Sequence, residues 1–197
     1  MKKLLESFMN SIQERSLDIY NEAALQYELA IYLREELKSK NYKIQLERNI
    51  KHFDLKRSDF VKQEMDIVIY KEQNSIKTEK HVIELKAIID QNISRPISVY
   101  QWIKDLEFIE QLSKEDFTCY SIFISNNEGY KVECKPNDSP LLKAIRSREF
   151  SGGYKTHQKE PKKGSKVGEA ELSKEYKFDW NEIKSCSRNL FYKVLES

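Results

Sequence analysis

Residues 64–90 read EMDIVIYKEQNSIKTEKHVIELKAIID, and this stretch decides the fold. Its two ends, residues 65–70 and 81–89, are rich in Ile and Val, whereas residues 71–80 between them are polar except for Ile76. This pattern is typical of two strands joined by a polar loop. The stretch therefore predicts a β-hairpin whose loop covers residues 71–80.

The second strand carries two charged side chains in an apolar setting. Glu84 and Lys86 share one face, and both faces are apolar at their ends, so the strand should lie in a sheet covered on two sides. Charges at that depth are costly unless they are paired or ligated. Antiparallel pairing brings Asp66, at the start of the first strand, close to Glu84.

These residue types suit a metal centre. The two carboxylates, with the backbone carbonyl between Glu84 and Lys86, offer the hard oxygen ligands that Mg²⁺ prefers. Lys86 adds a positive charge that can orient a water molecule and stabilise a phosphorane-like transition state. The alternative is a solvated ion pair of small energy, because 34% of the chain is charged.

Met65-Asp66 and Glu84-Leu85-Lys86, with seventeen residues between the two acids, resemble the motif of the PD-(D/E)xK phosphodiesterase superfamily. Many restriction endonucleases, Holliday-junction resolvases and repair nucleases share that fold. Met65 stands where the motif has proline. The resemblance implies that Asp66 and Glu84 bind Mg²⁺, with Mn²⁺ as an alternative ion, and that Lys86 is the catalytic lysine.

The elements around the hairpin follow from periodicity. Leucines recur every four residues in 21–39, which predicts a helix, and 42–50 alternates as a strand that should pair with the Asp66 strand. A helix over 97–112 and a buried strand over 117–125, parallel to its sheet partner, follow the hairpin. The predicted fold is α/β, with an αβββαβ core and a mixed central sheet flanked by helices. The superfamily resemblance makes this core restriction-endonuclease-like.

Helical side chains are further candidates for the site. The resemblance implies an additional acid on the helix before the sheet; helical phase favours Glu22, with Glu28 as the alternative and Gln26 as a site-lining residue. Glu22 can equally serve only the helix dipole from the first turn. On the helix over 97–112, Gln101, Lys104 and Asp105 are polar, and we rank Gln101 above Lys104.

Nucleic-acid contacts need local basic patches, because the net charge of the chain is only +2. One candidate patch precedes the first hairpin strand, and another is the loop that follows the second. Residues 151–170 are rich in Gly and Lys and are predicted to form a flexible basic loop that closes on nucleic acid, or else a solvated linker. The candidate contacts are Lys56, Arg57, Lys62, Arg95, Lys162 and Lys163.

The remaining segments give weaker predictions. Residues 3–19 form an amphipathic helix that either packs inside the chain or contacts a second copy in a homodimer. A short strand is expected over 130–135, a helix over 140–148, a strand over 176–180, a turn or short helix at 180–182 and a strand over 190–195. The chain of 197 residues fits one domain, and with neither a signal peptide nor a membrane span it is expected in the cytoplasm.

Function follows as three hypotheses. The first is a Mg²⁺-dependent nuclease that hydrolyses phosphodiester bonds of DNA in restriction, defence or repair, with RNA as another possible substrate. The second is a catalytically silent nucleic-acid-binding or assembly module with the same fold. The third is a partner-dependent subunit that cuts only within a complex, for example a homodimer formed through the helix over 3–19. The sequence contains no base-recognition motif and does not separate endonuclease from exonuclease action.

Overall fold

A six-stranded mixed sheet forms the centre of the computed structural model, which describes residues 1–90, 96–157, 169–186 and 188–197. All neighbouring strands are antiparallel except β3 and β4, which run parallel. In spatial order the strands are β1 (Lys43–Asn49), β2 (Glu64–Gln73), β3 (Ile76–Ile88), β4 (Phe117–Ser125), β10 (Arg188–Glu196) and β9 (Asn181–Ser185).

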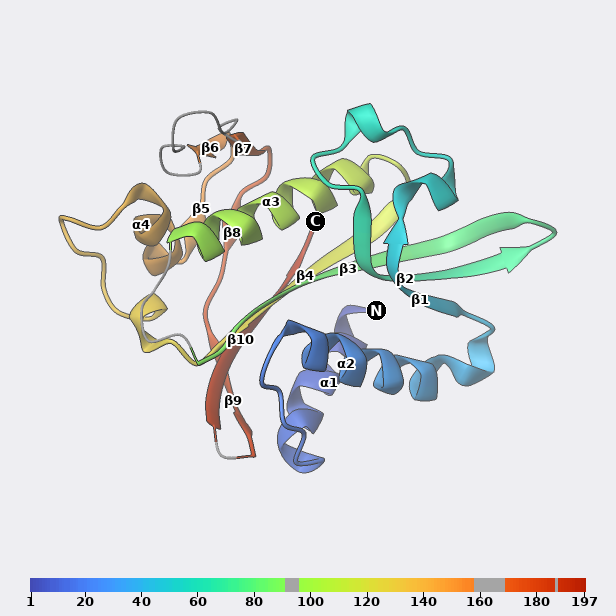
Figure 1. The fold of residues 1–197 in the computed structure, drawn as a ribbon, viewed down its shortest axis with the longest axis horizontal. Helices are drawn as coiled ribbons and strands as arrows, with labels where there is room; N and C mark the ends of the chain where they lie inside the picture. The colour runs from blue at the N-terminus through green and yellow to red at the C-terminus, as the bar shows by residue number, and fades with distance from the viewer. Residues whose placement is uncertain (91–95, 158–168, 187) are drawn as a thin grey trace.

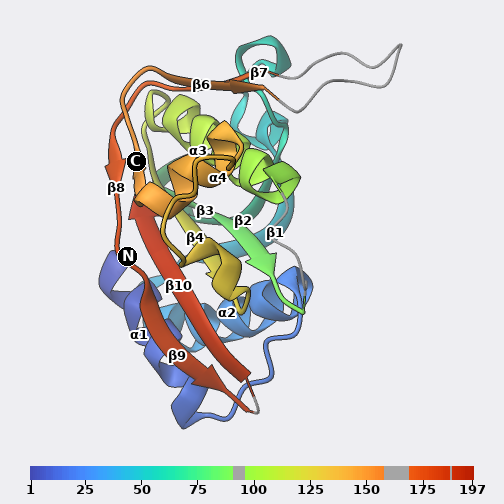
Figure 2. The ribbon, with the colours of Figure 1, turned by 90° about the vertical axis from the view of Figure 1, so that its left-hand side faces the viewer.

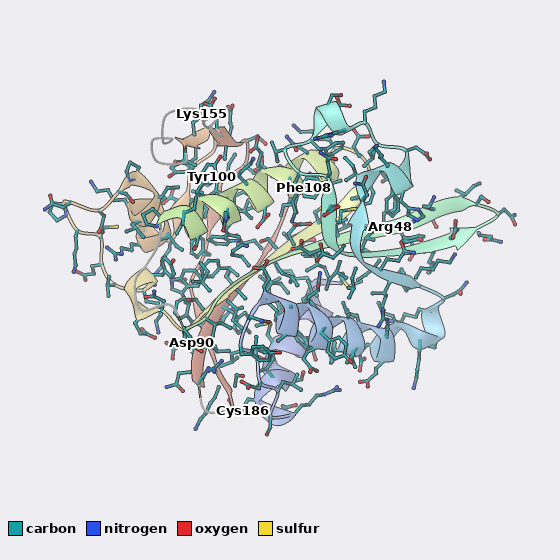
Figure 3. The ribbon with its side chains drawn as sticks, in the orientation of Figure 1. Arg48, Asp90, Tyr100, Phe108, Lys155 and Cys186 are labelled. Carbon is teal, nitrogen blue, oxygen red and sulfur yellow. The ribbon has the colours of Figure 1, made fainter. Side chains whose placement is uncertain are left out.

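Helices cover both faces of this sheet (Figure 1). One face packs against α1 (Lys2–Glu14) and α2 (Glu22–Leu37), through leucines of α2 and the Ile67 side of β2. The other face packs against α3 (Pro96–Ser113), where Trp102 and Leu106 meet Val82 and Phe123. Side chains fill the space on both sides of the sheet (Figure 3). The fold is therefore α/β with a mixed sheet between helical layers.

The chain order confirms the core predicted from periodicity. The elements α2, β1, β2, β3, α3 and β4 follow one another as helix, three strands, helix and strand. β1 pairs with β2, and β4 pairs in parallel with β3, both as predicted. Asn21 caps α2 by accepting a hydrogen bond from the backbone N–H of Ala24 at 2.8 Å, which fixes Glu22 in the first turn.

The hairpin is longer than predicted, because the polar residues 71–80 are mostly strand. β2 continues to Gln73 and β3 begins at Ile76, so only Asn74 and Ser75 form the turn. Their φ angles of 50° and 64° are those of a two-residue turn whose twist matches the flanking strands. The far end of the hairpin projects from the body of the sheet (Figure 1), which explains its lack of apolar residues.

Ser75→Gly should raise the free energy of unfolding by about 0.5–1 kcal/mol, because glycine tolerates a positive φ without steric strain. Urea denaturation of wild type and variant measures the change. Ser58→Gly is the matched control: Ser58 is exposed and lies outside the positive-φ positions, so this substitution should give no gain. A gain of equal size at both positions would contradict the explanation.

Several weaker predictions are corrected. Residues 131–135 form no strand, because the chain there turns out of the short helix η4 (Glu128–Tyr130). The predicted strand over 176–180 is reduced to β8 (Tyr176–Lys177), which pairs with β5 (Glu149–Phe150). The turn or short helix at 180–182 is wrong, since β9 begins at Asn181. The helix α4 (Pro140–Ser147) is confirmed, with Ser139 as its N-cap.

The described part of the basic segment is ordered into a ribbon. β6 (Tyr154–His157) pairs antiparallel with β7 (Glu169–Leu172), and Lys155 forms an ion pair with Glu171 at 3.0 Å. Figure 2 shows this ribbon at one end of the molecule, beyond α3. Residues 154–157 and 169–170 of the predicted loop over 151–170 are thus strand, and residues 158–168 lie outside the described part.

The first helix packs inside the chain. α1 ends at Glu14, earlier than predicted, and Ser16 follows with a φ of 54°. Its apolar face, with Leu5, Phe8 and Ile12 fully buried, lies against β9 and β10 (Figure 2). A homodimer contact would therefore need the outer side of α1. No helix in the described ranges combines the length and apolar character required to cross a bilayer.

Candidate active site

The β2–β3 register brings the two predicted acids together. Ile67 pairs with Ile83, which places Asp66 opposite Glu84 on the face toward α3. The backbone N–H of Asp66 donates to Glu84 Oε1 at 3.2 Å, and that of Leu85 donates to Asp66 Oδ2 at 2.7 Å. Glu84 is fully buried and Asp66 nearly so. The predicted proximity of the two carboxylates is confirmed, whereas their role as metal ligands remains a prediction.

Where β2 and β3 separate, side-chain carboxylates take the place of the backbone hydrogen bonds between the two strands. The paired register ends at Ile67 and Ile83, so the N–H groups of Leu85 and Ala87 have no strand partner on that side. Asp66 accepts from Leu85, and Glu22 Oε2 accepts from Ala87 at 3.0 Å. Carboxylates from β2 and α2 are thereby held along the part of β3 whose backbone is not paired with β2.

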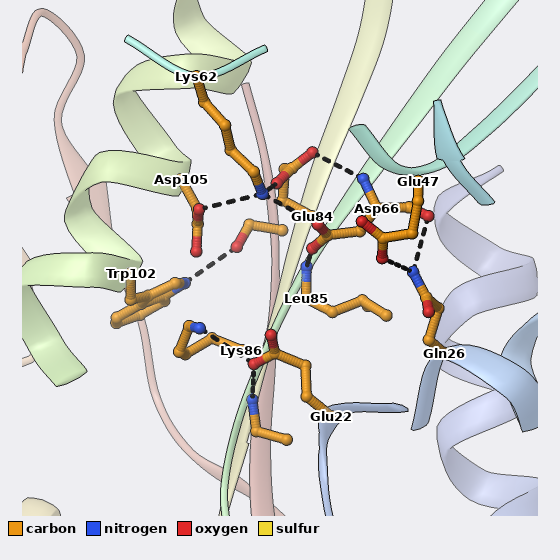
Figure 4. Close-up of polar contacts among 12 residues, drawn as sticks. Glu22, Gln26, Glu47, Lys62, Asp66, Glu84, Leu85, Lys86, Trp102 and Asp105 are labelled. Atoms are coloured by element: carbon orange, nitrogen blue, oxygen red, sulfur yellow. Dashed lines mark hydrogen bonds and ion pairs between the residues drawn. The ribbon is translucent and has the colours of Figure 1, made fainter. Parts of the chain in front are cut away.

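Lys86 lies beside this stretch and pairs with the helix acid. Its Nζ is 3.0 Å from Glu22 Oε2, and its side chain is only 16% exposed (Figure 4). Glu22 thus reaches the site from the first turn of α2, as phase favoured. Glu28 is half-buried, and no contact among the described residues joins it to the acids or to Lys86.

Gln26 also lines the site, as predicted. Its side-chain amide donates to the backbone carbonyl of Asp66 at 2.9 Å and to Glu47 Oε1 at 2.6 Å. Glu22, Gln26, Glu47 and Asp66 surround a cavity of about 250 Å³ between α2 and the hairpin. Glu47, on β1, was not a candidate from sequence, where it reads as an ordinary outward-facing strand residue.

Lys62 occupies the space between the acids. Its Nζ is 2.9 Å from Asp66 Oδ1 and 3.5 Å from Asp105 Oδ1, and it also forms an ion pair with Glu84 Oε2 (Figure 4). The sequence predicts a loop position for Lys62, either solvated or against a phosphate backbone. The loop position is confirmed, the side chain is paired with acids instead of solvated, and the phosphate contact stays a prediction. Its ammonium instead neutralises charge that the sheet buries.

The helix after the hairpin contributes Asp105, not the residue we ranked first. Gln101 is exposed and Lys104 is half-buried, whereas Asp105 is buried and faces Lys62. Asp105 follows Trp102 by three residues, and the Trp102 indole N–H donates to Ser121 on β4 at 2.9 Å. The sequence feature that points to Asp105 is an acid on the apolar face of the helix, where its charge is buried away from water.

Burial perturbs the protonation of this cluster. Burial, with the nearby charge of Asp66, raises the pKa of Glu84 well above its usual range, against the opposing effect of Lys62. Burial also raises the pKa of Asp105 to about 7, again opposed by Lys62. For Lys62, burial lowers the pKa, but the surrounding carboxylates outweigh it and the net shift is upward. Three carboxylates therefore compete to be charged around one cation.

The donor set fits a hard divalent cation. Asp66, Glu84 and Asp105 present only oxygen atoms, from three elements, to a single point. Within the described residues no three His, Cys, Asp or Glu side chains are grouped to hold a metal ion directly. The ammonium of Lys62 lies at their meeting point, so a metal would need that side chain to move.

Apart from Lys62, the candidate nucleic-acid contacts divide into two groups. Lys56 and Arg57 are exposed on the segment that leads to Lys62, where a phosphate backbone could reach them. Arg95, Lys162 and Lys163 lie outside the described residues. Comparisons of the chain with protein-family models, with curated proteins and with solved structures gave no match.

Proposed function

We propose that this protein is a Mg²⁺-dependent nuclease of the PD-(D/E)xK type that hydrolyses phosphodiester bonds of DNA. The observation that carries the proposal is the convergence of Asp66, Glu84 and Lys86 where β2 and β3 separate. Burying two carboxylates on neighbouring strands is costly, and a structural role alone would be served as well by apolar residues. A cation-dependent reaction accounts for their presence.

The order of elements supports the same proposal. A helix, three antiparallel strands, a helix and a parallel strand make up the restriction-endonuclease-like core, and α2, β1, β2, β3, α3 and β4 follow that order. The motif residues lie on the second and third of these strands. The fold alone would not assign an activity, so the weight rests on the site.

Each side chain then has a role in hydrolysis. Asp66 and Glu84 would hold Mg²⁺, which supplies a polarised water and neutralises charge on the phosphate. Lys86, held by Glu22 at 3.0 Å, orients the attacking water and stabilises negative charge on the phosphoryl oxygens. The water forms a new P–O bond while the bond to the 3′ oxygen breaks, which leaves a 5′-phosphate and a 3′-hydroxyl.

The substrate panel that tests this proposal contains supercoiled plasmid, linear duplex, single-stranded DNA and RNA. With Mg²⁺ or Mn²⁺ the wild-type protein should cut at least one DNA substrate, and EDTA should stop the reaction. Lys80→Met is a matched control that should retain activity, because Lys80, also on β3, donates to the Glu115 carbonyl and makes no described contact with Asp66, Glu84 or Lys86. Absence of cleavage on every substrate, or cleavage unchanged by EDTA, would contradict the proposal.

One observation favours a second function, a catalytically silent nucleic-acid-binding or assembly module. Lys62 already compensates the buried carboxylates, so the fold does not require a metal to satisfy them. Such a module would bind DNA equally with EDTA or Mg²⁺ and would cut nothing. Gel-shift and cleavage assays on the same preparations distinguish the two functions.

A further inference from the structure

We propose that Lys62 and a divalent metal ion compete for one cation site bounded by Asp66, Glu84 and Asp105, so that metal binding expels Lys62. This inference rests on the proposed metal-dependent function and adds to it a third carboxylate and an internal competitor. In the metal-free protein the ammonium of Lys62 holds the site closed.

Competition follows from how the carboxylate oxygens are used. Glu84 Oε1 accepts the N–H of Asp66, and Asp66 Oδ2 accepts the N–H of Leu85. Each carboxylate therefore has one oxygen left, and Lys62 Nζ contacts both: Oε2 of Glu84 and Oδ1 of Asp66. The oxygens least engaged within the fold, and therefore the ones most open to a metal ion, are the two that Lys62 holds.

Asp105, on α3, is the third carboxylate around the ammonium of Lys62. Its Oδ1 is 3.5 Å from the same ammonium, and the side chain is buried on α3. In its ionised form, this third carboxylate is stabilised here by positive charge at the point where the three acids meet. When all three carboxylates are ionised, one ammonium leaves two negative charges uncompensated, whereas a divalent cation leaves one. Charge balance thus favours the metal.

Lys62 can leave without disturbing the sheet. The residue lies between the short helix η3 (Arg57–Asp59) and β2, outside both, and its side chain is 31% exposed. The backbone beside it is anchored: the N–H of Val61 donates to Gln111 at 2.9 Å, and the carbonyl of Gln63 accepts from Ile50 at 2.8 Å. Rotation of the side chain alone moves the ammonium to solvent.

The first test is Mn²⁺ binding by isothermal titration calorimetry at pH 8, with the full chain stripped of metal. Lys62→Met should bind Mn²⁺ at least about tenfold more tightly than wild type, since the competitor is removed. Asp105→Asn should bind at least about threefold more weakly. Lys80→Met, the matched lysine control, should leave the affinity unchanged. Equal or weaker binding by Lys62→Met would overturn the inference.

A second test uses the wild-type chain and stays decisive if Lys62→Met fails to fold. A water-soluble amine-labelling reagent, followed by peptide mass spectrometry, reports how accessible each lysine is. Labelling of Lys62 should rise several-fold when Mn²⁺ is added, while labelling of Lys80 stays constant. Labelling of Lys62 that is unchanged at saturating Mn²⁺ would overturn the inference.

The two proposals fail in different ways. If neither wild type nor Lys62→Met binds Mn²⁺, both the metal-dependent function and the competition are wrong. If wild type binds Mn²⁺ and cuts DNA, but Lys62→Met binds no more tightly, the nuclease proposal survives and only the competition is lost.

Discussion

Lys86→Met should lower the rate of phosphodiester cleavage by about 10²–10³-fold, because it removes the positive charge that stabilises the transition state. The stability of the fold should change little: among the described residues, the one ion pair lost is with Glu22, whose side chain is 43% exposed. Glu22 also keeps its hydrogen bond to the N–H of Ala87. Single-turnover rates on the best DNA substrate measure the effect.

Mn²⁺ affinity provides the internal control for this variant. Lys86 does not contact Asp66 or Glu84 in any described interaction, so Lys86→Met should bind Mn²⁺ as tightly as wild type. A variant that binds metal normally but has lost cleavage separates chemistry from metal binding. Cleavage within about threefold of wild type would remove Lys86 from the mechanism.

Asp105→Asn should stabilise the metal-free protein at pH 8 by on the order of 1–3 kcal/mol, and this gain should vanish near pH 4. Burial raises the pKa of Asp105 from 3.8 to about 7 in the folded state. Between pH 3.8 and about pH 7, Asp105 is protonated in the folded state and ionised in the unfolded state. The wild-type protein therefore has its full stability below pH 4 and loses this contribution as the pH rises through 7. Asparagine does not ionise, so the variant lacks this pH dependence.

Urea denaturation in EDTA at a series of pH values measures this effect. Asp116→Asn is the matched control, because Asp116 is 98% exposed and its replacement should give no pH-dependent difference from wild type. A difference between Asp105→Asn and wild type that is constant from pH 4 to 8 would contradict the buried, protonated carboxyl. The same result would also weaken the case for three acids around one cation.

The hairpin predicted over residues 64–90 was enough to predict the proximity of Asp66 and Glu84. Antiparallel pairing across the hairpin brings the start of β2 and the end of β3 together, and the observed register places the acids opposite each other. The helix acid was also within reach of sequence: Asn21 caps α2, and the cap sets the phase that turns Glu22 toward β3.

Lys62 and Asp105 could not be assigned in the same way. Lys62 lies outside helix and strand, so no periodicity sets the direction of its side chain; the anchors at Val61 and Gln63 are tertiary contacts. Asp105 carried a usable signal, because it shares the buried stripe of α3 with Trp102 and Leu106. The resemblance favours the exposed Gln101 on that helix, whereas helical phase points to Asp105.

The positions of β9 and β10 in the sheet could not be predicted from the sequence, for a topological reason. β10 enters between β4 and β9, so the last strand of the chain lies inside the sheet and not at its edge. Its partner β4 is more than sixty residues earlier in the sequence. Pairing over such separations is decided by which buried surfaces remain to be covered, and no local pattern around residues 181–196 reports that.

Thermal unfolding with and without Mn²⁺, for wild type and Asp66→Asn, tests most directly whether the two strands share a cation. At a Mn²⁺ concentration of 100 times the dissociation constant, wild type should gain about 2.7 kcal/mol and its Tm should rise, whereas Asp66→Asn should show little or no rise. A wild-type Tm that does not change when Mn²⁺ is added, or an equal rise in both proteins, would contradict a metal centre built from Asp66 and Glu84.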